Sequence, residues 1–174
     1  MQVDMWLPFA VSEATGLRVG DVVKLRVADV RENGEITYTA EKTGKDGVAH
    51  VPPKLVELLR KNSRGTEWCF PSPIRTGEHL TRQAIYARIK TAAKKAGLSS
   101  FGISPHSFRK IFAVNLFHRS NIGTVKEALQ HSSAVVTELY ALADWLTGEN
   151  ANMPLLRCDI EKIVGAVLKA LDKR

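Results

Sequence analysis

Residues 104–110 read SPHSFRK, a string that sets a histidine and an arginine three residues apart, His106 and Arg109. Side chains with this spacing share one face of a helix, so both groups would point the same way. An isolated pair of this kind carries little meaning, and its interpretation depends on the strings that accompany it. The chain from His106 onward is predicted to be helical, with short breaks at about 119–122, 131–133 and 144–156.

Two further strings carry side chains of related chemistry. Residues 15–21 read TGLRVGD and contain Arg18, whereas residues 129–140 read LQHSSAVVTELY and contain His131 and Tyr140. Between them, a lysine stands where a predicted strand enters a hairpin turn of sequence KTGK. The six groups are two fixed cations, a lysine acid, two imidazoles and a phenol: Arg18, Lys42, His106, Arg109, His131 and Tyr140.

These six groups meet the needs of phosphodiester cleavage. Such a reaction requires a nucleophile, charge stabilisation on the non-bridging oxygens, and a proton for the departing oxygen. Arginine suits the second task because its planar fork gives two parallel bonds to a phosphate. A free phenol has a pKa of about 10, so Tyr140 would need cations and a base beside it. The set predicts cleavage of DNA through a phosphotyrosine, with no metal and no cofactor, although each residue alone also has an ordinary structural explanation.

The bulk composition describes one basic globular domain. The 174 residues include 25 Lys and Arg against 18 Asp and Glu, a formal net charge of +7. Such a surface favours nucleic acid as a partner, although a merely soluble basic protein fits the charge as well. The two cysteines show neither a disulfide framework nor a metal-type spacing. With no signal peptide and no apolar run long enough for a membrane span, we expect a cytoplasmic protein.

The hydrophobic pattern predicts a mostly α-helical fold with one small antiparallel β-sheet, an α+β class. Helices are predicted at about 5–16, 19–26, 53–62, 82–97 and 157–172, and strands at 35–42 and 48–52. Residues 62–80 are expected to be a loop with a short strand at WCF, and Thr81 is expected to cap the helix that follows. Predicted buried residues are Val22, Val23, Leu25, Leu55, Leu58, Leu59, Ile85, Ile89, Ala92 and Ala96.

Taken together, TGLRVGD, the KTGK hairpin, HSFR, and LQHSS followed by Tyr140 resemble the tyrosine recombinase (phage integrase) family over about residues 10–145. The resemblance implies that family's catalytic-domain fold and mechanism. Arg18 and Arg109 would clamp the scissile phosphate, and His131 would add a hydrogen bond. His106 would assist the proton transfer of Tyr140, which would attack and become linked to the 3′ phosphate.

The resemblance also assigns two supporting roles. Lys42 would act as the general acid for the leaving 5′ oxygen, with Lys45 of the same turn as a competitor. Asp21 would buttress the site from the next turn of chain, although a carboxylate at a helix N-terminus explains it equally.

Double-stranded DNA is the implied partner. Basic residues expected to contact DNA are Lys45, Arg75, Arg82, Arg88, Lys94 and Lys95. The apolar stripe of the predicted C-terminal helix at 157–172 would support self-association on DNA by docking on a neighbouring copy, unless it packs on its own domain.

Residues 1–174 are expected to form a single catalytic domain with a core at about 5–145 and no N-terminal core-binding domain, because about 17 residues precede Arg18. Two other functions remain open. One is strand relaxation like that of a type IB topoisomerase, which uses the same side chains. The other is a DNA-binding remnant or regulator without catalysis.

Overall fold

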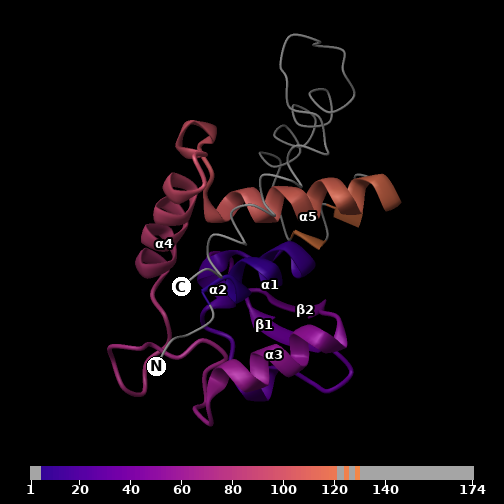
Figure 1. The fold of residues 1–174 in the computed structure, drawn as a ribbon. Helices are drawn as coiled ribbons and strands as arrows, with labels where there is room; N and C mark the ends of the chain where they lie inside the picture. Colours follow the sequence, from indigo (N-terminus) through magenta and orange to yellow (C-terminus); the bar gives the residue numbers. More distant parts are fainter. Residues whose placement is uncertain (1–4, 121–123, 126–127, 130–174) are drawn as a thin grey trace.

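The computed structural model describes residues 5–120, 124–125 and 128–129 (Figure 1). The predicted α+β class is confirmed, with helices surrounding one two-stranded antiparallel sheet. The elements, in chain order, are α1 (Leu7–Thr15), α2 (Val19–Val22), β1 (Glu35–Thr39), β2 (Asp46–His50), α3 (Pro53–Ser63), α4 (Arg82–Lys95) and α5 (Pro105–Arg119), with single 3₁₀ turns at Val27–Asp29 and Ser99–Phe101.

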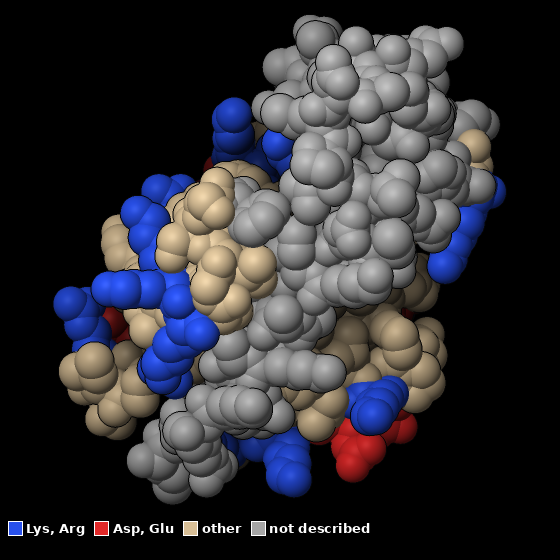
Figure 2. Space-filling model, turned by 45° about the horizontal axis from the view of Figure 1, so that its top comes forward, with Lys and Arg blue, Asp and Glu red and all other residues tan. Residues whose placement is uncertain are grey.

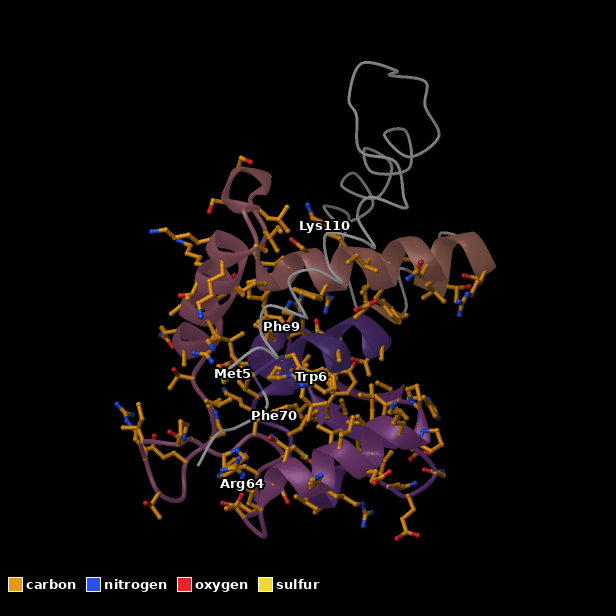
Figure 3. All side chains as sticks on the ribbon, in the orientation of Figure 1. Met5, Trp6, Phe9, Arg64, Phe70 and Lys110 are labelled. Atoms are coloured by element: carbon orange, nitrogen blue, oxygen red, sulfur yellow. The ribbon has the colours of Figure 1, made fainter. Side chains whose placement is uncertain are left out.

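Helix α1 packs against α5, and this pair forms the upper part of the core in Figure 1. The rings of Phe9 and Phe108 lie 4.8 Å apart between their centres, and both side chains are fully buried. Figure 3 shows Met5, Trp6, Phe9 and Phe70 along the middle of the molecule, between α5 and α3. One apolar core therefore runs from α1 and α5 to α3, and a second, smaller cluster consists of Ala113, Val125 and Leu129 with Phe112 and Leu116 packed against it.

Helix α1 ends where the sequence predicts, at a glycine. Gly16 has the left-handed φ of 72°, and its N–H donates to the carbonyl of Ser12 over 2.9 Å. Glycine adopts this conformation without the Cβ penalty of other residues. The turn redirects the chain into α2, which is shorter than predicted and ends at Val22, although Val22, Val23 and Leu25 are buried as expected.

The two strands form a hairpin whose turn comes earlier in the chain than predicted. Strand β1 ends at Thr39 and β2 begins at Asp46, with Tyr38 opposite Gly47. The predicted strand reached residue 42, but the N–H of Ala40 donates to Lys45 O and that of Gly44 to Ala40 O, both over 2.8 Å, which closes the turn earlier. Strand β2 ends before Pro52, which has no N–H to extend the ladder.

Helices α3 and α4 follow the predicted ranges closely. In α3, Leu59 is fully buried while Leu55 and Leu58 are partly buried, and Val56 joins the core unexpectedly. Thr81 caps α4 by accepting a hydrogen bond from the N–H of Ala84 over 3.1 Å. Ala96, predicted to be buried, is only partly so because the helix ends at Lys95, and Ala93 takes its place in the core.

The segment between α3 and α4 contains isolated bridges instead of the predicted WCF strand. Arg26 pairs with Trp68 and Pro71 with His79. The indole N–H of Trp68 donates to Gly77 O over 2.9 Å, which ties the loop to itself. None of the helices in the described part of the chain is long and apolar enough to cross a membrane.

Candidate active site

A buried arginine joins three of the four strings singled out in the sequence. The Arg109 side chain on α5 is only 9% exposed. Its Nη1 donates to the carbonyl of Gly16, and its Nη2 donates to the carbonyl of Leu129 over 2.7 Å. Gly16 belongs to the TGLRVGD string, and Leu129 opens the LQHSS string. The guanidinium therefore holds the C-terminal end of α1 and the backbone at Leu129 to the same helix, α5.

Arg18 brings a second guanidinium to this place. It is the N-cap residue of α2, with the extended φ of −66° and ψ of 141°, and its side chain is partly buried. Burial, together with a smaller effect of the positive charge of Arg18, lowers the pKa of Arg109 to about 10. Two cations in a partly desolvated setting repel each other, and a bound anion such as a phosphate would relieve that repulsion. The pair is therefore suited to holding an anion.

A carboxylate balances part of this charge. Asp21 of α2 is 6% exposed, and its negative charge favours the protonated form of Arg109. Its Oδ1 accepts a hydrogen bond from the backbone N–H of Glu41 over 3.0 Å. Asp21 thus links α2 to the base of the hairpin turn, in agreement with a supporting role.

Tyr38 is a site residue that the sequence reasoning did not single out. Burial raises the pKa of its phenol, which the cations Arg109 and Arg18 lower and the Asp21 carboxylate raises. All four groups therefore share one electrostatic environment. The signal was available in the strand alternation: Tyr38 stands between Ile36 and Ala40, whose side chains are 0% and 2% exposed, so it faces inward with them.

Lys42 lies in the exposed turn between β1 and β2, beyond the end of β1 at Thr39, and not at the end of the strand where the sequence placed it. Lys45, its competitor, lies in the same turn, is also exposed, and uses its backbone carbonyl to close the turn. His106 lies in the first turn of α5, one turn before Arg109, but its side chain is exposed whereas that of Arg109 is buried. His131, Tyr140 and the predicted helix at 157–172 lie outside the described residues.

Basic side chains gather on the side of the molecule where α4 lies (Figure 2). Arg82, Lys94 and Lys95 are exposed on this helix, and Arg88 is partly buried. Arg75 is exposed in the loop before α4, where its Nη1 lies 3.2 Å from Glu78 Oε2. Five of the six residues predicted to contact DNA therefore lie on α4 or in the loop before it, and Lys45 lies apart on the hairpin.

Neither a metal site nor a reactive cysteine thiol is found among the described residues. The part of the chain that the structure describes contains no group of three or more His, Cys, Asp or Glu side chains placed to hold a metal ion. Cys69 is buried, and burial raises the pKa of its thiol to about 12. A thiol in that state is a poor nucleophile at neutral pH.

The chain is similar in sequence to proteins of a known family. Residues 6–145 match the model of the phage integrase family. The tyrosine recombinase XerD of Rhizobium meliloti (strain 1021) is 31% identical over 135 residues, which are 73% of this chain and 43% of that protein. The tyrosine recombinase XerA of Pyrococcus furiosus is 31% identical over 133 residues, 72% of this chain and 46% of that one. The chain thus spans less than half the length of these relatives.

Solved structures share the fold. The XerH site-specific recombinase bound to its difH substrate, before cleavage, superposes with a TM-score of 0.64 at 22% identity, over 81% of this chain and 44% of that one. The crystal structure of the XerA recombinase superposes with a TM-score of 0.61 at 23% identity, over 85% of this chain and 62% of that one.

Proposed function

The chain belongs to the phage integrase family, and we propose on this premise that it is a site-specific DNA recombinase that cleaves and rejoins strands through a 3′-phosphotyrosine. The observation that carries the proposal is the buried guanidinium of Arg109, which binds the carbonyls of Gly16 and Leu129. Arg18 follows Gly16 by two residues, and the turn that bears Lys42 is tied to α2 through the N–H of Glu41 and Asp21 Oδ1. This is the minimum needed to hold a phosphate and deliver a proton to its leaving oxygen.

In the proposed reaction, Arg18 and Arg109 hold the non-bridging oxygens of the scissile phosphate, and His131 adds a hydrogen bond. The phenolic oxygen of Tyr140 forms a bond to phosphorus, and the bond from phosphorus to the 5′ oxygen breaks. Lys42 gives its proton to that oxygen, while His106 assists removal of the phenolic proton.

The second half of the reaction reverses the first. The 5′ hydroxyl of a partner strand attacks the phosphotyrosine and expels the phenol, which restores the phosphodiester. The energy of the original bond is kept in the covalent intermediate, so the proposed exchange needs no energy source such as ATP.

We infer that double-stranded DNA contacts basic side chains of α4 and of the loop before it. Phosphate contacts of this kind are independent of sequence and fall with salt. Self-association on DNA through the segment at 157–172 stays a prediction. Sedimentation of a chain ending at Thr147 tests it, because a self-association that survives the truncation would rule out that segment.

Covalent trapping tests the proposed chemistry. The protein is incubated with supercoiled plasmid and with a pool of nicked duplexes of randomised sequence around the nick, then separated in detergent. A protein–DNA adduct is expected from the unaltered protein and from the matched Tyr86→Phe variant on α4, but not from Tyr140→Phe. An adduct that survives Tyr140→Phe would place the nucleophile elsewhere. DNA binding without any adduct would favour a DNA-binding protein without catalysis.

A further inference from the structure

Three side chains recur at intervals of three residues along α2 and the turn that follows it. Arg18 precedes the helix, Asp21 lies within it, and Lys24 follows it. The backbone continues as a helical turn after α2, because the N–H of Lys24 donates to Asp21 O over 3.2 Å. The spacing of three residues therefore places these side chains on the same side of the helix. Arg18 and Asp21 belong to the site described above, but Lys24 has no role assigned so far.

Glu41 connects to the last two of these residues. Its backbone N–H donates to Asp21 Oδ1 over 3.0 Å, and its Oε1 lies 2.8 Å from Lys24 Nζ. The carboxylate also reaches across the helix: a Cβ placed on Gly20 would lie 3.8 Å from Glu41 Oε2. One residue of the hairpin is thus attached to α2 through both its backbone and its side chain.

The contacts of Glu41 with α2 and Lys24 lie at the base of the turn that contains Lys42. Glu41 directly precedes Lys42, and residues 41–45 are all exposed. Gly44, at a φ of 64°, has no atom within 4 Å of the place where a Cβ would stand, so the end of the turn projects from the protein. The two bonds of Glu41 therefore act at the point where the projecting turn meets the folded body.

We propose that Lys24 is a positioning residue for Lys42, and that its ion pair with Glu41 holds the turn in register with the Arg18–Arg109 pair. The inference rests on the proposed function, since it needs Lys42 as the general acid. An exposed ion pair changes an equilibrium only modestly. A general acid, however, must lie within hydrogen-bond reach of the leaving oxygen, so a small displacement of the turn lowers the rate.

The two partners have opposite charges, which separates positioning from DNA affinity. Lys24→Gln removes a cation near the DNA and should weaken binding, whereas Glu41→Gln removes an anion and should strengthen it. Both changes break the same pair. Under single-turnover conditions with DNA saturated by protein, both variants should therefore cleave more slowly, by about two- to fivefold, and the double variant should be no slower than the slower single.

The decisive measurement compares the cleavage rates of two DNA substrates that differ only in the leaving atom. A duplex with the sequence mapped from the adduct of the unaltered protein is made with either oxygen or sulfur at the bridging 5′ position. A thiol has a pKa of about 8.5, far below that of an alcohol, so a sulfur leaving group departs without a general acid. Lys24→Gln and Glu41→Gln should be slow on the oxygen substrate and as fast as the unaltered protein on the sulfur substrate.

Two control variants complete the test. Lys24→Arg keeps the ion pair and should cleave the oxygen substrate at the normal rate. Glu35→Gln breaks an ion pair at the other end of β1, in which Glu35 Oε1 lies 2.6 Å from Arg31 Nη1, and should slow neither substrate.

Each contrary result has a distinct meaning. Equal slowing of Lys24→Gln on both substrates, or no slowing on the oxygen substrate, would overturn the inference and leave the proposed function standing. No adduct from the unaltered protein on any DNA would remove the proposed function and this inference with it.

Discussion

Gly16 and Phe112 approach so closely that a Cβ on Gly16 would overlap the Phe112 ring. The contact brings the end of α1 onto α5 and leaves the Gly16 carbonyl where Arg109 binds it. The same glycine also needs its left-handed φ of 72° to end the helix. Gly16 of the TGLR string thus meets two independent requirements, space for the Phe112 ring and a left-handed φ.

Gly16→Ala tests this relationship, with Gly97→Ala as its control. Gly97 has the same φ of 72° but no atom within 4 Å of a Cβ. We expect Gly97→Ala to lower the free energy of unfolding by about 1–2 kcal/mol, for the left-handed conformation alone. Gly16→Ala should lower it by about 2–5 kcal/mol, because overpacking adds to the conformational cost. Urea denaturation measures both, and equal decreases would show that the Phe112 ring yields freely.

Arg109→Ala should destabilise the fold as well as abolish cleavage. The change leaves the buried carbonyls of Gly16 and Leu129 without their donor, and we expect the free energy of unfolding to fall by about 2–4 kcal/mol. Arg119→Ala, at the exposed end of the same helix, should change it by less than about 0.5 kcal/mol. A fully stable Arg109→Ala protein would mean that the two carbonyls find other donors.

Stability should fall at alkaline pH through Cys69. Its pKa is raised from 9.0 to about 12, so the folded state keeps the proton that the unfolded state loses above about pH 9. The unfolded state then binds fewer protons, and the free energy of unfolding decreases as the pH rises, by about 1.4 kcal/mol between about pH 8 and pH 10.

Cys69→Ala isolates this contribution. The variant should lose that much less stability over the same pH interval, whatever its absolute stability. The other titrations, including that of Arg109 with its pKa of about 10, occur in both proteins and cancel in the difference. Identical slopes for the two proteins would show that the thiol ionises as readily in the fold as outside it.

Neutralising the end of α4 should reduce the salt dependence of DNA binding. For Lys94→Gln/Lys95→Gln, the slope of log K against log salt should become shallower by about 0.9 for each DNA phosphate that the variant no longer neutralises. The control is Lys54→Gln/Lys61→Gln on α3, which removes the same charge from exposed positions on another face. Equal changes in both double variants would show that net charge alone governs binding, with no preferred face.

The sequence could predict much of the fold because the residues that begin and end its helices act through local interactions. Gly16, Thr81 and the proline at the start of α3 each end or begin a helix by their own chemistry, and the structure agrees. The strand ends were wrong because the turn is closed by backbone bonds between Ala40, Gly44 and Lys45, which no side-chain pattern records.

The sequence could predict which residues belong to the site, but not the hydrogen bonds that connect them. The sequence indicated Arg18 and Arg109 as a phosphate clamp, a role that stays a prediction. It could not indicate that Arg109 is buried and bound to two distant carbonyls, because that depends on how α5 crosses α1. The Lys24–Glu41 pair escaped notice for the same reason, since its two partners come from different elements, whereas Tyr38 could have been found from the alternation of β1.

The bond from Arg109 to Gly16 closes a loop across 93 positions of the chain, and the bond to Leu129 requires another 20. Contacts of such long range form late in folding, because the entropy of closing the loop must be overcome first. During synthesis the chain emerges from its N-terminus, so Arg18 is exposed to the cell well before Leu129 exists. A nascent or truncated chain therefore has basic surface but lacks the bonds of Arg109, and the proposed phosphate clamp can assemble only after Leu129 has been made.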